Sequence, residues 1–353
     1  MALVPVTVFE NSITDRIYKM VGSTNIVDCP HPAQDPIPTF ITQMKQEIIA
    51  KGETDAIIIQ PLQEHRQTFI ILHGRGSSAK ILSTDLLFST TTNNETIQSA
   101  FPNAKFVFLN ALEMEPSIFK GTQTQDSHPL LVHSNIFSDA QSRTSSPMLI
   151  RQWYDHWFDP DYSDTSLLAA AGLHASCSYM HKLLQQEIQM IGKDNVVLWG
   201  SRQGASVALS TLLTWEKEAF AAVIGMSGWL PYDKSVWNYA NGDDSDLPHH
   251  DPWWGEDTYW EKENEDDPDY DWPTKAAKYF RFELYLQERK GEVFKEVPVF
   301  LGQGKTDPAL GTRAAKCLKI LGADIRTVEY DDSFSVHGCS RRMLDDIVTF
   351  LRD

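Results

Sequence analysis

Short runs of β-branched and aliphatic residues alternate along this chain with helical segments of about ten residues or more. We predict strands at residues 56–59, 68–72, 105–109, 195–198, 221–226, 297–301 and 325–330. The predicted helices lie at residues 166–191, 205–215 and 343–351. This alternation is typical of an α/β fold with a mostly parallel sheet and helices on both faces. In such a sheet, functional residues are expected at the carboxyl ends of the strands.

The composition fits a folded domain and excludes several binding functions. The chain has 353 residues, 42% of them hydrophobic, which is enough for a sizeable core. Its formal charge of −17 argues against binding of nucleic acid or of an anionic membrane surface. No stretch approaches the ~18 apolar residues of a membrane span, and the N-terminus lacks the basic region of a signal peptide. The four cysteines show no CxxC spacing, so we expect a reduced, cytoplasmic protein.

One segment concentrates most of this negative charge. Residues 243–272 contain thirteen acidic side chains and one basic residue, Lys262, together with four tryptophans. Acidity alone predicts a solvated or disordered loop. The four tryptophans argue against pure disorder, because disordered segments are poor in aromatic residues. We therefore predict a partly ordered surface insertion that serves as a lid. The run His249-His250-Asp251 within this segment has no further group of ligands beside it, so no metal site is expected. No cofactor is expected either.

The strongest local signal is a predicted strand followed by Gly200-x-Arg202-x-Gly204 and a predicted helix. A nucleophile elbow requires small residues two positions before and two after its central residue, because the turn packs tightly and projects the central side chain above the sheet. The glycines satisfy this rule around position 202. The central residue is nevertheless Arg202, whose guanidinium stays protonated and is no nucleophile.

Two serines near the elbow are weaker candidates for the nucleophile. Choosing Ser201 as the centre would put Trp199 and Gln203 at the positions that must be small. Ser206 lies in a loose small-x-Ser-x-small pattern, but one turn into the predicted helix and away from the strand end. Ser201 is the better of the two, and neither fits as well as position 202.

The remaining parts of an esterase site follow in order along the chain. Asp307 lies in a loop after the strand predicted at 297–301, and His337 lies between the last predicted strand and the last helix. In α/β-hydrolases the nucleophile comes first along the chain, the acid second and the histidine last, and the candidate positions here follow that order. The turn His73-Gly74-Arg75-Gly76 follows an early strand and is of the kind that supplies an oxyanion-hole amide; the Gln203 amide would supply the second.

The chain resembles the phospholipase/carboxylesterase family of α/β-hydrolases, which includes the acyl-protein thioesterases. The matching stretches, in sequence order, are Phe69–Gly76, Gln152–Asp155, Val196–Gly204, Gly225–Pro231, and Pro298–Gly304 with Asp307 and His337. The family pattern at the elbow is Gly-x-Ser-Gln-Gly, which places the family's serine on Arg202. Gln303 also departs from the family, whose members commonly have histidine at that position.

The resemblance implies an α/β-hydrolase domain over residues 51–353, with residues 1–50 as an N-terminal extension and an insertion at about 233–292. It further implies Asp307 and His337 as triad members, the amides of Arg75 and Gln203 as the oxyanion hole, and Gly74, Gly76 and Trp153 as neighbouring binding residues. The expected ligand is a small-molecule or acyl substrate, and the oligomeric state stays undetermined.

Three functions remain open for such a chain. In the first, the protein is a carboxylesterase or thioesterase relative whose hydrolysis is weak or lost because Arg202 replaces the nucleophile. In the second, Arg202 and His337 serve a non-hydrolytic lyase, isomerase or cyclase reaction on a small carbonyl or carboxylate substrate. In the third, the protein is a pseudoenzyme that binds an acyl ligand or another protein.

Overall fold

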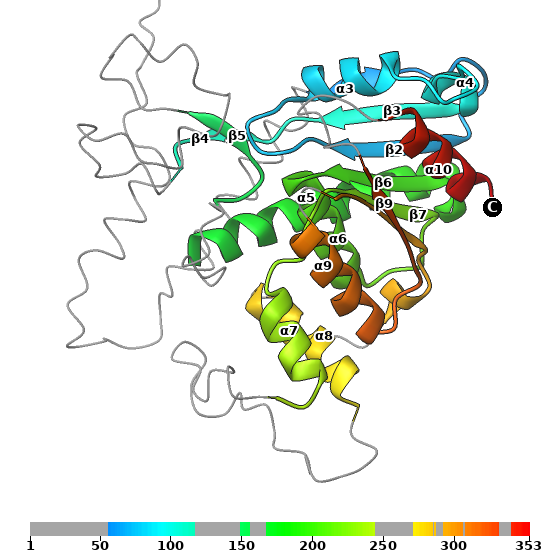
Figure 1. Cartoon of the computed structure of the whole chain (residues 1–353). Coiled ribbons are helices and arrows are strands. Elements are labelled where there is room, and N and C mark those ends of the chain that lie inside the picture. The colour runs from blue at the N-terminus through cyan, green and yellow to red at the C-terminus, as the bar shows by residue number, and fades with distance from the viewer. Residues whose placement is uncertain are drawn as a thin grey trace, which may run out of the picture.

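A seven-stranded sheet forms the centre of the protein, with strand order β1-β3-β2-β6-β7-β8-β9 (Figure 1). The computed structural model describes residues 56–116, 149–155, 167–243, 271–284, 286, 292–305, 308–331 and 340–353. Strand β1 pairs antiparallel with β3, and every other neighbouring pair is parallel. The mostly parallel sheet predicted from the sequence is confirmed.

The strands coincide closely with the predicted apolar runs. They are β1 (Ile57–Ile59), β2 (Gln67–Leu72), β3 (Ala104–Leu109), β6 (Val196–Ser201), β7 (Ala222–Met226), β8 (Val299–Gly304) and β9 (Ile325–Tyr330). All five residues of β7 are buried, as expected for a central parallel strand covered on both faces. Strand β8 begins two residues later than predicted, because the short 3-10 helix Val293–Lys295 and a turn occupy the chain before it.

Helices cover both faces of this sheet and enclose two separate hydrophobic cores. One face packs against α3 (Ala79–Phe88), α4 (Ile97–Ala100) and α10 (Arg341–Arg352). The other packs against α5 (Leu167–Ile191), α6 (Gln203–Thr214), α7 (Asp233–Ala240), α8 (Trp272–Glu283) and α9 (Pro308–Ile320). Alternate residues of one strand serve the two cores: Phe69 and Ile71 face α10, whereas Ile70 and Leu72 face α6.

Helices α7 and α8 lie within the segment 233–292 that the sequence marks as an insertion. They pack on each other and on α9 and α6, and bury Val236 and Phe280 completely (Figure 1). This part of the segment therefore belongs to the packed body of the protein. The acidic residues between the two helices, at positions 244–270, and the N-terminal extension 1–50 lie outside the described residues, so the lid and the domain boundaries stay predictions.

A small second sheet lies beside the main one. It consists of β4 (Leu112–Met114) and β5 (Ile150–Gln152), which pair antiparallel. The Arg151 guanidinium binds the Glu113 carboxylate across this pair at 2.9 Å. Because β5 leads directly into Trp153 and Tyr154, the small sheet positions the segment that contacts the elbow.

Candidate active site

The turn between β6 and α6 has the geometry of a nucleophile elbow. Arg202 lies between the last residue of the strand and the first residue of the helix, with φ 53° and ψ −117°. Side chains with a Cβ atom rarely adopt this combination, which costs about 1–3 kcal/mol and persists only where the surroundings enforce it. The Arg202 amide donates to the Met226 carbonyl of β7 at 2.7 Å, and its carbonyl accepts from the Ala205 and Ser206 amides.

The two glycines that flank Arg202 are required by close backbone contacts. A Cβ atom on Gly200 would lie 2.2 Å from the Gly204 carbonyl oxygen, and one on Gly204 would lie 2.4 Å from the Leu72 carbonyl oxygen. Both distances are far below van der Waals contact, and the atoms involved are backbone. The steric rule inferred from the sequence therefore holds at positions 200 and 204, and the residue that it presents is Arg202.

The Arg202 side chain is exposed and lies against the turn after β2. A Cβ atom on Gly74 would be 3.1 Å from both Cβ and Cδ of Arg202, so the methylene chain of the arginine runs across the Gly74 backbone. Within the ranges that the structure describes, the Arg202 guanidinium forms no ion pair. The stem of Arg202 thus covers the residue just before the proposed Arg75 amide donor.

The turn after β2 has a defined conformation that glycine permits. Gly76 has φ 73°, in the left-handed region, and its amide donates to the Arg151 carbonyl at 2.8 Å. The Ser77 amide donates to the Gly74 carbonyl at 3.1 Å. Burial lowers the pKa of Arg75, and the nearby Tyr154 and Asp155 partly oppose this shift. The turn is therefore held by β5 and by its own backbone bonds.

Gln203 connects the elbow to the segment after β5. Its side chain is buried, with Oε1 accepting from the Trp153 amide at 3.0 Å and Nε2 donating to the Tyr154 carbonyl at 2.9 Å. As the first residue of α6, it has a backbone amide with no carbonyl one turn earlier in the helix to bind. The same residue thus fixes its neighbours through its side chain and presents an amide near Arg202.

His73 and Trp153 extend this network beside the turn after β2. The Trp153 indole donates to the His73 carbonyl at 2.7 Å. His73 Nδ1 donates to the Gly74 carbonyl at 2.7 Å, and Nε2 accepts from the Ala111 amide at 3.0 Å, so the ring is neutral. Burial lowers the pKa of His73 from 6.5 to about 4. These contacts link residues far apart in the sequence and have no motif that would predict them.

The alternative serines have different surroundings. Ser201 is the last residue of β6 and is partly exposed. Ser206 is fully buried in the first turn of α6, and its hydroxyl lies 2.8 Å from the Tyr154 hydroxyl. This burial gives Ser206 a packing role. Asp307 and His337 lie outside the described residues; β8 ends at Gly304 and the adjacent, parallel β9 ends at Tyr330.

Comparisons with known proteins agree with this geometry. Residues 120–264 match the sequence profile of the phospholipase/carboxylesterase family. Acyl-protein thioesterase 1 of Schizosaccharomyces pombe is 28% identical over 181 residues, which cover 51% of this chain and 63% of that protein. Over these residues the chain is similar to the phospholipase/carboxylesterase family and to an acyl-protein thioesterase, and it spans less than two thirds of the length of that thioesterase. Acyl-protein thioesterase 1 of Cryptococcus neoformans is similar at 23% identity, over 57% of this chain and 68% of that protein.

A solved structure supports the fold described above. Acyl-protein thioesterase 2 of Zea mays superposes with a TM-score of 0.51 at 17% identity, covering 84% of this chain and 97% of that one. The chain therefore has the α/β-hydrolase fold. Among the described residues, no cluster of three potential metal ligands occurs, and no helix combines the length and apolar character that crossing a membrane requires.

Proposed function

We propose that this protein keeps the acyl-binding architecture of its family but hydrolyses esters and thioesters weakly or not at all. One observation supports this proposal: Arg202 occupies the strained turn between β6 and α6, with its stem against Gly74. The resemblance to the family places the nucleophilic serine at this position. A guanidinium cannot form an acyl-enzyme intermediate. Its methylene chain also lies beside the turn from which the Arg75 amide would contact an acyl oxygen.

The retained features support binding of an acyl group. These features are the glycines at 200 and 204, the buried hydrogen bonds of the Gln203 side-chain amide and the turn after β2. Asp307 and His337 complete the proposed site as acid and base. An oxyanion hole and substrate binding alone can leave about 10³-fold catalysis over water, so slow residual hydrolysis fits this proposal.

The test compares wild type with Arg202→Ser, using a fluorophosphonate probe and p-nitrophenyl ester hydrolysis. We expect little labelling of wild type and both labelling and ester hydrolysis by the variant. Arg202→Ala is the matched control, because it removes the guanidinium without supplying a hydroxyl, and His337→Ala in the Arg202→Ser background should abolish the gain.

Two results would overturn this proposal. Stoichiometric labelling of wild type at Ser201 would move the elbow by one residue. A folded Arg202→Ser variant that neither reacts with the probe nor hydrolyses esters would show that the acyl-binding site itself is absent.

A second function is favoured by the exposure of the Arg202 guanidinium, which no described residue pairs. Arg202 would bind a substrate carboxylate or an enolate, with His337 as acid or base, in a lyase, isomerase or cyclase reaction. Titration with octanoate should then show binding that weakens at least ten-fold in Arg202→Gln, and less in Arg202→Lys, which keeps the charge but loses the bidentate geometry. Equal affinity in all three proteins would exclude this role.

A further inference from the structure

Positive φ angles occur at the carboxyl ends of two neighbouring strands, β6 and β7. Besides Arg202, Ser227 directly after β7 has a φ of 50°, in the left-handed region that residues with a Cβ atom rarely adopt. Such residues persist only where their surroundings enforce the conformation, and they cluster at functional sites. The two other non-glycine cases in the described ranges have local explanations, since Asn94 lies in an exposed turn between α3 and α4 and Tyr232 directly precedes α7.

Ser227 lies directly beside the elbow, because the residues before and after it both contact the Arg202 backbone. The Met226 carbonyl accepts from the Arg202 amide at 2.7 Å. On the other side, a Cβ atom on Gly228 would lie 3.3 Å from the Arg202 carbonyl oxygen. The Ser227 amide donates to the Gly302 carbonyl of β8 at 2.8 Å. Backbone contacts to both neighbouring strands therefore fix the position of Ser227.

The Ser227 side chain is accessible from the elbow. The residue is partly exposed, and its hydroxyl forms no hydrogen bond within the part of the chain that the structure describes. The Arg202 stem extends the other way, across Gly74 of the turn after β2. Because β2 and β7 lie on opposite sides of β6 in the sheet, the stem of Arg202 leaves the β7 side of the elbow to Ser227.

Serine at position 227 carries a conformational cost that glycine would avoid. Glycine adopts positive φ without strain, so a turn that needed only this backbone conformation would favour glycine. What serine adds is chiefly a hydroxyl, which can donate one hydrogen bond and accept others. Since this hydroxyl bonds to no described residue, it does not offset the strain within the fold, and a role in ligand binding is favoured.

We propose that Ser227 is a ligand-binding residue of the elbow, whose hydroxyl donates to the head group of an acyl ligand. This inference rests on the acyl-binding role proposed above. The amides of Arg75 and Gln203 would contact the ligand from the turn after β2 and from the start of α6, whereas Ser227 contacts it from the end of β7. A carboxylate or a carboxylic ester has two oxygen atoms, so it can accept from the amides and from Ser227 at once.

Isothermal titration of the whole chain with octanoate tests this proposal. We expect saturable binding to wild type and about ten-fold weaker binding to Ser227→Ala, which is the loss expected for one hydrogen bond to a charged group. Ser227→Gly also lacks the hydroxyl but adopts positive φ without strain, so it should lose the same affinity while melting at a higher temperature than Ser227→Ala. Ser235→Ala is the matched control, because it removes another partly exposed serine, in α7, and should leave the affinity unchanged.

Three results would overturn the role of Ser227: no saturable binding of octanoate to wild type at millimolar concentration, equal affinity in wild type and Ser227→Ala, or a loss of affinity in Ser227→Ala that Ser227→Gly does not share. The last result would assign the effect to the backbone. The fluorophosphonate reaction of Arg202→Ser reports on the proposed function separately. If that variant reacts while the Ser227 variants bind octanoate like wild type, only the role of Ser227 fails.

Discussion

Gly200 and Gly204 show how little room the elbow leaves for a single added carbon. A methyl group on Gly200 would meet the backbone of Gly204 and Ala205 at 2.2–2.4 Å. We expect Gly200→Ala to lower the free energy of unfolding by about 3 kcal/mol, at the upper end of overpacking costs, as measured by urea denaturation. Gly311→Ala in helix α9 is the control. Its new methyl would meet the end of the Gln303 side chain of β8, which can move aside, and we expect almost no loss.

His73 makes the stability of the protein depend on pH. Burial holds its pKa near 4 in the folded state, against 6.5 in the unfolded state, so between these values the unfolded chain binds more protons. Stability from this group is fully present above pH 6.5 and is lost as the pH falls toward 4, by about 3 kcal/mol.

Denaturation of wild type and His73→Gln across pH 4–7 measures this effect. We expect the difference in unfolding free energy between the two proteins to shrink as the pH falls. A difference that stays constant across the range would contradict the assignment of this pH dependence to His73.

At the scale of elements, a buried ion pair joins helix α5 to the sheet. The Glu187 carboxylate accepts from Lys105 Nζ of β3 at 2.7 Å and from the Thr68 hydroxyl of β2 at 2.9 Å. Glu187→Met alone should lower the free energy of unfolding by about 3 kcal/mol, because Lys105 would stay buried without a counter-charge.

The double variant Glu187→Met/Lys105→Met should recover most of that loss, since replacing both charges by apolar groups is often neutral. Urea denaturation of the two single variants and the double variant gives the coupling energy of the pair. Additive losses would show that the ion pair contributes nothing beyond its separate side chains.

The elements that the sequence predicted and those that it missed differ in their physical signal. Strands such as β2 and β7 are short, mostly apolar runs with β-branched residues, and α10 has a clear apolar face, so their sequence patterns identified them. Helices α7 and α8 border the acidic segment, and α8 begins with Trp272-Pro273, which masked their helical pattern. Strands β4 and β5 have three residues each, too few for a periodic signal.

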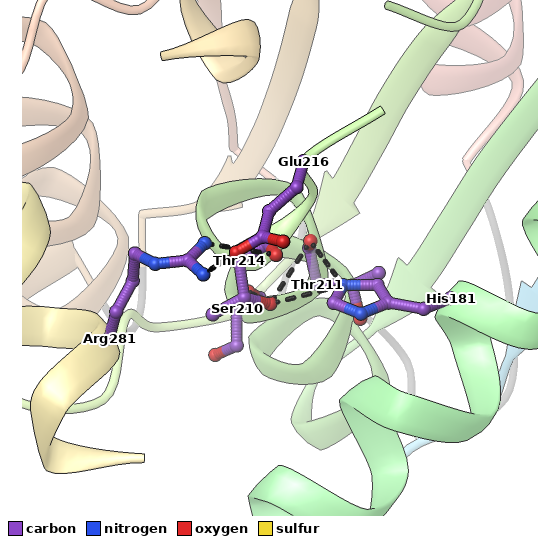
Figure 2. A network of polar contacts seen from close by, with 6 residues as sticks. All are labelled: His181, Ser210, Thr211, Thr214, Glu216 and Arg281. Carbon is purple, nitrogen blue, oxygen red and sulfur yellow. Dashed lines mark hydrogen bonds and ion pairs between the residues drawn. The ribbon is translucent and has the colours of Figure 1, made fainter. Parts of the chain in front are cut away.

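The same distinction applies to the candidate site. The glycine spacing around Arg202 is local and was readable from the sequence, whereas the bonds of Gln203 to Trp153 and Tyr154 join residues about fifty positions apart. The contacts of Arg281 in α8 with the Thr214 carbonyl and with Glu216 likewise join elements that meet only in the folded chain (Figure 2). Only the local part of the candidate site has a sequence signature.

At the scale of the whole molecule, negative charge is distributed unevenly. Thirteen acidic residues between positions 243 and 271 account for most of the charge of −17. Self-repulsion weakens as salt screens it, so raising the sodium chloride concentration from 10 to 300 mM should increase the melting temperature by a few degrees.

A variant with eight of these acidic residues changed to Asn or Gln should lose most of that salt response. Differential scanning calorimetry of both proteins at the two salt concentrations makes the comparison. An equal increase in wild type and variant would mean that charges elsewhere in the protein produce the effect.

The backbone of the turn at Arg202 is set by the glycines, by β7 and by the turn after β2, and none of these contacts involves the functional end of the side chain at position 202. Any residue placed there is held above the same point of the sheet. A single codon change can therefore exchange a guanidinium for a hydroxyl, a thiol or a carboxylate without rebuilding the scaffold. The elbow can therefore hold different functional groups at one fixed position, and a single substitution there could change the chemistry of the site.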